Sequence, residues 1–224
     1  MTDSPPTVAV VHATPAAMAP AADAFATAFP QARIWNLLDD LLLKQAEQES
    51  GITAPLRRRM STLIGYAVDG GADAVLLSCS LYGPVAQELA PAYPVPVLAS
   101  DQALFEEVAR RRPARVTVLG PVRGGVDDTV ARLRTHLAAA SVGGKVAGAV
   151  VGGARTAGDG AALAQLVGAA AQRVRQHSDL VLLGQFSLAP GLAAARDSAD
   201  VPVLSAAHVA ATALRRRLGA EATP

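Results

Sequence analysis

The residue with the clearest chemical potential is Cys79, the only cysteine of the chain, in the stretch "ADAVLLSCSLYGP" (72–84). It ends an apolar run and has a serine on each side. A thiol in such a place can act as a general acid/base or as a nucleophile. A lone cysteine is also often just a small buried apolar residue. Here a strand should turn into a loop before a helix N-terminus, whose positive end favours a thiolate, so we expect Cys79 to be functional.

Two other stretches place polar side chains after an apolar run. "HATP" (12–15) offers His12, which fits either a catalytic base or a loop histidine with its hydrogen bonds satisfied. "NLLDD" (36–40) offers Asp39 and Asp40. We expect one of these carboxylates to orient a substrate amine or hydroxyl, or to pair with an arginine.

Composition narrows the class of protein. The 224 residues carry 20 basic and 19 acidic side chains, a balance that indicates neither nucleic acid nor an anionic membrane as a partner. One cysteine excludes an internal disulfide and a cysteine-rich metal site, and the histidines show no metal-ligand spacing, so no metal is expected. The glycine-rich stretches match no nucleotide-binding motif. The N-terminus lacks the basic and apolar pattern of a signal peptide, which predicts a soluble, cytoplasmic protein.

The elements that must position these residues alternate along the chain. Eight short apolar runs predict buried strands of parallel sheets, at 7–11, 33–38, 74–78, 95–99, 115–119, 146–151, 180–184 and 201–205. Stretches with helical spacing lie between them, at 16–29, 55–69, 101–112, 123–139, 161–176 and 206–218. The "RRR" runs at 57–59 and 215–217 fall on these helices and indicate solvated faces. The alternation predicts an α/β fold.

An internal repeat divides the eight strands into two sets of four. Residues 72–112 lie over 178–218 without a gap, and both copies contain "VPVL", at 95–98 and 201–204. The repeat predicts two lobes related by a pseudo-twofold axis, 1–99 plus 206–224 and 100–205. It makes Gln185 the counterpart of Cys79. Since ligands bind beyond the carboxyl ends of parallel strands, we expect Cys79 to face Gln185 and Ser187 across a cleft between the lobes.

The segment "GADAVLLSCS" and the repeat together resemble the aspartate/glutamate racemase superfamily, whose halves each carry a cysteine after a strand in a motif like G-A-D-x-[IV]-[IV]-L-[GA]-C-[TN]. The second copy here, "SDLVLLGQFSLAP", keeps the frame but has Gln185 in place of the cysteine. The resemblance covers nearly the whole chain. It implies two similar α/β lobes, each a four-stranded parallel sheet flanked by helices, and catalysis without a cofactor. It also implies that Thr14 and Ser80 contact the substrate, unless they merely cap helices.

The departure at Gln185 bears on the reaction. Two-base inversion of a carbon centre needs a proton acceptor and a proton donor on opposite faces, and an amide does neither near neutral pH. The resemblance therefore implies an isomerase or lyase that acts on a small carboxylate by proton transfer, cis–trans isomerisation or decarboxylation, with Cys79 as its single thiol. The alternatives are a non-catalytic protein that binds a small carboxylate, and an amino-acid or hydantoin racemase with an unusual second acid/base. Helices rich in Ala and Leu are compatible with a homodimer.

Overall fold

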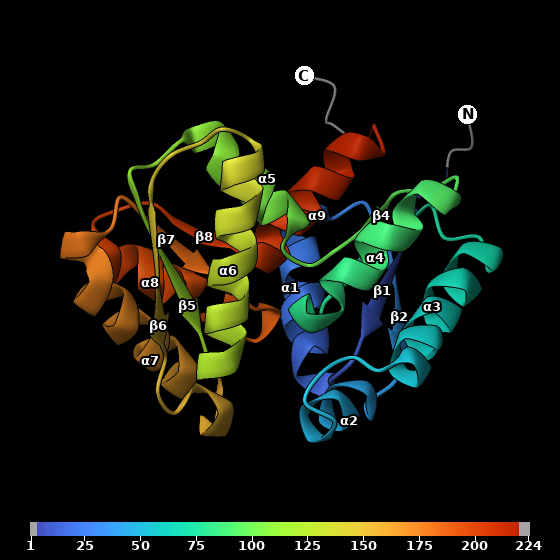
Figure 1. Cartoon of the computed structure of the whole chain (residues 1–224), viewed down its shortest axis with the longest axis horizontal. Coiled ribbons are helices and arrows are strands. Elements are labelled where there is room, and N and C mark those ends of the chain that lie inside the picture. The colour runs from blue at the N-terminus through green and yellow to red at the C-terminus, as the bar shows by residue number, and fades with distance from the viewer. Residues whose placement is uncertain (1–3, 220–224) are drawn as a thin grey trace. The chain divides into compact units, whose positions relative to one another are not determined.

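The computed structural model describes residues 4–219, which fold into two compact units (Figure 1). Unit 1 contains residues 1–102 and 210–224, and unit 2 contains residues 103–209. The outermost residues of the first expected lobe, 1–3 and 220–224, lie outside the described part. The chain thus leaves unit 1 once and returns to it near its end.

Each unit is built on one four-stranded parallel sheet flanked by helices, as the sequence predicts. The order in unit 1 is β2-β1-β3-β4, and the strands are β1 (Thr7–His12), β2 (Arg33–Leu38), β3 (Ala74–Leu77) and β4 (Val97–Leu98). The order in unit 2 is β6-β5-β7-β8, and the strands are β5 (Arg115–Gly120), β6 (Lys145–Val150), β7 (Leu180–Leu183) and β8 (Val203–Ser205). The two orders are equivalent.

The internal repeat also holds at the level of strand register. Val8 of β1 pairs with Ala74 of β3, and Val116 of β5 pairs with Leu180 of β7. The amide one residue before each of these inner strands makes the same ladder bond: Asp73 N donates to the Thr7 carbonyl at 2.8 Å, and Asp179 N donates to the Arg115 carbonyl at 2.8 Å. The two units are therefore copies of one arrangement of strands.

Position in the sheet explains the strand sequences. The inner strands β1, β3 and β7 are buried along their whole length, which suits their unbroken apolar runs. The outer strand β4 is shorter than its predicted range of 95–99, and β8 is shorter than 201–205. Pro96 and Pro202 have no N–H to give, although their carbonyls still accept from Val75 and Val181.

Nine helices connect the strands within residues 4–219. They are α1 (Met18–Ala28), α2 (Leu42–Gln48), α3 (Ala54–Asp69), α4 (Gly83–Leu89), α5 (Gln102–Arg111), α6 (Arg123–Ala139), α7 (Gly160–Val174), α8 (Leu192–Ala199) and α9 (Ala206–Arg217). The repeat places Pro190 at the opening of a helix. It lies instead inside a 3-10 helix, Phe186–Gly191, and α8 begins after it. Helix α2 is not among the stretches with helical spacing found in the sequence.

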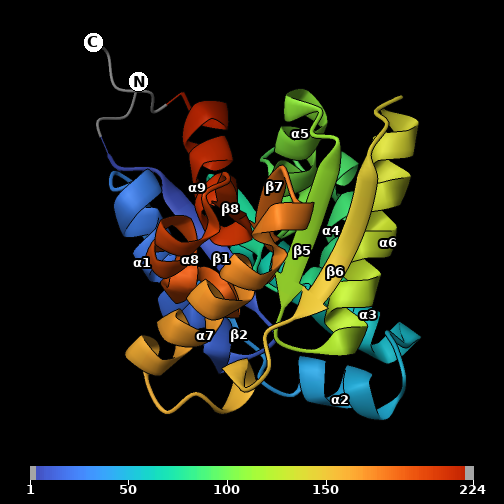
Figure 2. The same cartoon turned by 90° about the vertical axis from the view of Figure 1, so that its left-hand side faces the viewer.

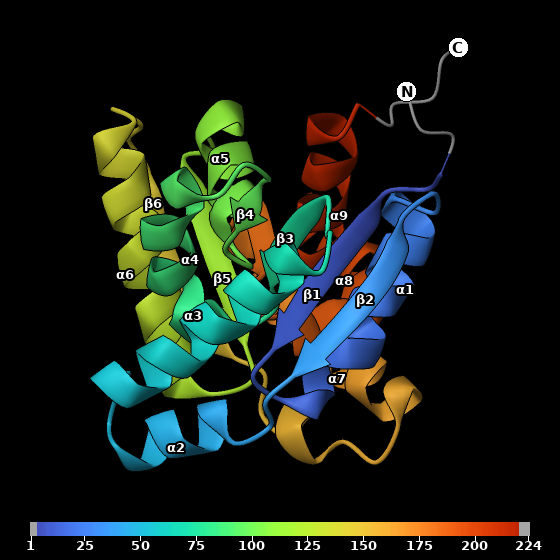
Figure 3. The ribbon, with the colours of Figure 1, turned by 90° about the vertical axis from the view of Figure 1, so that its right-hand side faces the viewer.

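Helices cover both faces of each sheet. In unit 1, α3 and α4 cover one face and α1 covers the other (Figure 3). The core between the sheet and the face covered by α3 and α4 includes alternate residues of the inner strands, such as Val11 and Leu77, together with Met60 and Tyr82. In unit 2, α6 lies on one face, and α7 and α8 lie on the other (Figure 2). In both units, the loops that follow the strands gather at the carboxyl edge of the sheet.

Candidate functional site

Three of the loops singled out by the sequence meet at the carboxyl edge of the first sheet. The ladder continues just beyond the strands: Ser78 N donates to the Val11 carbonyl at 3.0 Å, and Asp39 N donates to the His12 carbonyl at 3.1 Å. The loops after β1, β2 and β3 are thus hydrogen-bonded side by side. The structure brings His12, Asp39 and Cys79 to one edge of one sheet.

Cys79 lies two residues after the end of β3, forms no disulfide and has 8% of its surface exposed. It takes the cap position of a short 3-10 helix, Ser80–Tyr82, and its carbonyl accepts from Tyr82 N at 3.2 Å. Helix α4 follows, with Pro84 in its first turn, where proline is tolerated. The thiol therefore lies where a buried strand turns into a helical segment.

Tyr82 lies near this thiol and is influenced by it electrostatically. Its side chain is fully buried, and its hydroxyl donates to the Leu42 carbonyl of α2 at 3.0 Å. Burial and, to a smaller extent, the nearby Cys79 raise the pKa of Tyr82 to about 12, and Arg59 opposes part of this shift. Tyr82 therefore stays a neutral hydrogen-bond donor at physiological pH.

Asp39 is held by an arginine, one of the two roles expected for this pair of carboxylates. Arg59 of α3 donates from Nε to Asp39 Oδ2 at 2.9 Å and from Nη2 to Asp39 Oδ1 at 2.6 Å. Its remaining nitrogen, Nη1, donates to the side-chain oxygen of Gln45 in α2. Asp39 and Arg59 thus fasten the segment after β2 onto α3.

His12 is buried and has both ring nitrogens engaged. Nε2 lies 2.9 Å from Asn36 Oδ1, which only accepts, so Nε2 carries the proton. Nδ1 then accepts from the Ser78 hydroxyl at 2.8 Å. Burial lowers the pKa of His12 below 6.5, and the bond to Asn36 opposes part of this shift. Of its two expected readings, the geometry matches the satisfied histidine.

The duplicated unit has three glycines where unit 1 has this polar row. By strand register, Gly120 takes the place of His12, Gly184 that of Ser78, and Gly148 that of Asn36. A Cβ on Gly120 or Gly148 would meet Val126 of α6 at 2.7 or 2.3 Å. In unit 2 the helix therefore fills the space that polar side chains fill in unit 1, and the fold itself does not require the polar row.

The sequence leaves open whether Thr14 and Ser80 contact the substrate or cap helices. Thr14 does precede a 3-10 helix, Pro15–Ala17, but its side chain makes no capping hydrogen bond. Ser80 is the first residue of its 3-10 helix, and Cys79 holds the cap position. Both residues lie at the same carboxyl edge as Cys79, and both are half-buried.

Gln185 and Ser187 occupy the corresponding edge of the second sheet. Gln185 caps the 3-10 helix after β7, and its carbonyl accepts from Leu188 N at 3.0 Å. Its amide lies against the first turn of α6, because Nε2 is 2.2 Å from where a Cβ on Gly125 would be. The missing side chain at Gly125 thus makes room for the glutamine, and Ser187 is half-buried beside it in the chain.

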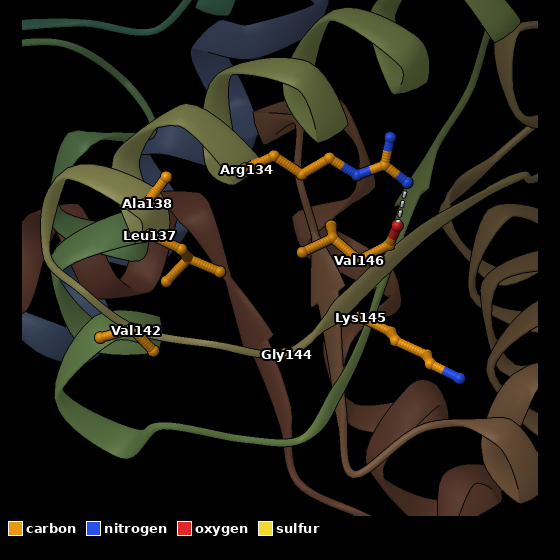
Figure 4. A pocket seen from close by; sticks show the side chains of 7 residues that line it. All are labelled: Arg134, Leu137, Ala138, Val142, Gly144, Lys145 and Val146. Atoms are coloured by element: carbon orange, nitrogen blue, oxygen red, sulfur yellow. Dashed lines mark hydrogen bonds between the residues drawn. The ribbon is translucent and has the colours of Figure 1, made fainter.

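A pocket of about 570 Å³ lies elsewhere, at the start of β6 and the end of α6 (Figure 4). Arg134 on its wall donates to the Val146 carbonyl of this edge strand, and the side chain of Lys145 points away from the Arg134 guanidinium. This is the amino edge of the sheet, opposite to where parallel sheets bind ligands. Within residues 4–219 no group of three His, Cys, Asp or Glu side chains could hold a metal ion. None of the helices described is long and apolar enough to cross a membrane.

Comparison with known proteins agrees with the duplicated α/β architecture. The sequence profile described as Asp/Glu/Hydantoin racemase matches residues 44–214. The chain belongs to this racemase family. No curated protein sequence matches it.

Solved structures similar to this racemase-family chain include enzymes of different reactions. Allantoin racemase from Klebsiella pneumoniae is 15% identical with a TM-score of 0.70, covering 96% of this chain and 88% of the other. Picrophilus torridus aspartate racemase is 13% identical with a TM-score of 0.70, covering 96% and 94%. Unliganded arylmalonate decarboxylase is 19% identical with a TM-score of 0.62, covering 97% and 94%. At these identities the likeness establishes the fold and leaves the reaction open.

Sequence reasoning missed several residues that complete this edge. Arg59 lies in an "RRR" run that predicts a solvated helix face, and nothing in the sequence around Asn36 marks it as functional. Ser78 and Tyr82 lie in the stretch around Cys79, but their residue types alone assign them no role. One signal was available: the stretch between "RIWNLL" and the next helix is longer than its counterpart in the second half, which indicates an extra element in the first unit.

Proposed function

We propose that this racemase-family protein is a cofactor-independent isomerase or lyase that acts on a small carboxylate with Cys79 as its single reactive thiol. The observation that carries the proposal is the unequal pair of strand ends. Cys79 follows β3 at the carboxyl edge, and Gln185 occupies the equivalent position after β7. A thiol can take up and return a proton, but an amide cannot do so near neutral pH.

The roles of the other residues follow from their chemistry. Thr14 and Ser80 supply hydroxyls that are not spent on capping bonds, and we assign them to the substrate carboxylate. Gln185 and Ser187 are assigned to substrate binding, with Gln185 as a hydrogen-bonding group and not as a base. His12 and Asp39 support the loops of this edge through their own partners, Ser78 and Arg59.

The test is solvent exchange in deuterium oxide. The protein is incubated with a panel of small carboxylic acids, including malonates, amino acids and unsaturated diacids, and each acid is analysed by NMR and mass spectrometry. For at least one acid we expect deuterium at one carbon, loss of carbon dioxide, or conversion of a cis diacid into its trans isomer. Cys79→Ser should slow that reaction by at least about a hundredfold, the usual contribution of a general acid/base. Full activity in Cys79→Ser would refute the role of the thiol.

The rival function, a non-catalytic protein that binds small carboxylates, predicts a different result. In that case no acid of the panel exchanges, although some of them bind. Alkylation separates the two functions further. A catalytic Cys79 should react with iodoacetamide at mildly acidic pH and be protected by the ligand, whereas a thiol of ordinary reactivity favours the binding protein.

A further inference from the structure

Unit 1 contains an element that unit 2 lacks. Between β2 and α3 the chain runs through residues 39–53 and forms α2, whereas residues 151–159 between β6 and α7 form only a short 3-10 helix, Ala154–Thr156. We call residues 39–53 the capping segment. It lies beyond the ends of β1 and β2 (Figure 3), and Leu43 N donates to the Ala13 carbonyl at 3.3 Å. The extra element therefore sits at the carboxyl edge that carries Cys79.

Arg59 holds the capping segment at two points. Its Nε and Nη2 donate to Asp39 at the start of the segment, and its Nη1 donates to Gln45 in the middle of α2. All three guanidinium nitrogens are thus engaged. Arg59 is therefore fitted to fasten the segment, and it is not placed to bind a substrate carboxylate in the same conformation.

The capping segment also contacts the surroundings of the thiol. Leu42 and Ala46 of α2 belong to the same buried cluster as Cys79 and Tyr82. The Tyr82 hydroxyl donates to the Leu42 carbonyl at 3.0 Å, and Tyr82 stands three residues after Cys79 in the chain. The segment is thereby tied to α3 on one side and to the turn that bears the thiol on the other.

We propose that the capping segment is the wall that limits the size of ligands reaching Cys79, and that Arg59 is the positioning residue that keeps this wall closed. The proposal rests on the proposed function in taking Cys79 as the group that meets the substrate. It assigns the protein to compact carboxylates, since a bulkier acid would have to displace α2. Arg59 acts through Asp39 and Gln45 and does not touch the substrate.

The experiment measures alkylation of Cys79, the sole cysteine, by two reagents of different size. Iodoacetamide is the small probe, and a maleimide that carries a polyethylene glycol chain is the large one. In Arg59→Gln we expect the rate with the large reagent to rise about fivefold, as for the loss of a part-exposed ion pair, and the rate with iodoacetamide to change much less. Arg57→Gln is the matched control, because the side chain of Arg57 on the same helix pairs with Glu88 of α4. Only its backbone N–H, which the variant keeps, donates to the segment, at the Thr53 carbonyl.

Two further variants keep the proposal falsifiable. Tyr82→Phe removes only the hydroxyl tie to Leu42 and should raise the large-reagent rate about two- to threefold, within the range for one hydrogen bond. Arg59→Lys keeps the charge but not the paired contacts, so it should fall between wild type and Arg59→Gln. Equal acceleration of both reagents, or no change in their ratio in any variant, would overturn the proposal. Alkylation needs no turnover, so a Cys79→Ser variant that stays active would defeat the proposed function while leaving this result readable.

Discussion

Replacing His12 with leucine tests whether the buried polar row stabilises unit 1. Leucine has nearly the volume of histidine, so the change removes two hydrogen bonds and leaves little cavity. The lost partners are the Ser78 hydroxyl at 2.8 Å and Asn36 Oδ1 at 2.9 Å.

The expected loss in free energy of unfolding is modest, because Ser78 and Asn36 can both form other hydrogen bonds. Each buried hydrogen bond contributes about 1 kcal/mol net, which sets the loss at about 2 kcal/mol. The Ser78 hydroxyl has a second acceptor, the Val11 carbonyl at 3.5 Å, and Asn36 is exposed and recovers water. Burial of the leucine side chain in place of the imidazole offsets a further part of this loss. We therefore expect His12→Leu to lower the free energy of unfolding by about 1–2 kcal/mol, or the melting temperature by about 2–8 °C for a chain of this size.

The pH dependence of the free energy of unfolding is a more specific test of His12 than the size of the loss. Because burial holds the pKa of His12 below 6.5 in the folded state, the unfolded chain binds the proton more readily. The neutral histidine therefore contributes its full stability above pH 6.5, and this contribution is lost as the pH falls from 6.5 through the folded pKa. In His12→Leu this dependence should be absent, so the difference between the two proteins should shrink toward acid.

Trp35 makes the assay specific to unit 1. It is the only tryptophan of the chain and lies in β2, so its fluorescence follows the unfolding of this sheet. Urea titrations from pH 5 to pH 8 on wild type, His12→Leu and the control His177→Leu give the comparison, since His177 is exposed. A His12→Leu protein as stable as wild type at pH 8, or one whose difference from wild type does not vary with pH, would refute the reasoning.

Two glycines give further predictions, each with a control glycine that has open space around it. Gly125→Ala places a methyl carbon 2.2 Å from Gln185 Nε2, so the amide must move. Displacing one hydrogen bond of this amide to the substrate should raise KM about two- to tenfold. Gly124→Ala, with open space around it, should leave KM unchanged. A KM unchanged in Gly125→Ala would remove Gln185 from the binding site. Gly191→Ala puts a Cβ within 2.5 Å of Val167 and should destabilise unit 2 by about 1–3 kcal/mol in circular dichroism melts, whereas Gly160→Ala, which meets nothing, should not. Equal melts would contradict the close packing of α7 against the 3-10 helix that precedes α8.

The architecture was predictable because it rests on patterns that are local or repeated. Unbroken apolar runs such as "AVLL" and "LVLL" indicate inner strands, and the gapless repeat fixes which strands correspond. Strand order and register then follow the duplication, since equivalent sequences form equivalent ladders. The outer strands fell furthest short of their predicted ranges, where Pro96 and Pro202 interrupt the donors.

The surroundings of Cys79 were less predictable because their partners are distant in the sequence. Asn36 lies 24 residues from His12, and Ser78 lies 66 residues from it. Nothing local in "RRR" distinguishes Arg59, which binds Asp39, from its exposed neighbour Arg58. Side-chain networks that cross strands and helices depend on three-dimensional proximity, which the pattern of apolar residues does not encode.

The discontinuity of unit 1 also has a consequence for how the protein is made. On the ribosome, every residue of unit 2 has been synthesised by Val209, before the last part of α9 that belongs to unit 1. Arg215 in that part of α9 donates to the Ala28 carbonyl at the end of α1. Since domains fold as units, unit 2 has all of its own residues without the last part of α9, whereas the unit that carries Cys79 is complete only with it. A stop codon near residue 209 should therefore impair the N-terminal unit more than the one that directly precedes the stop.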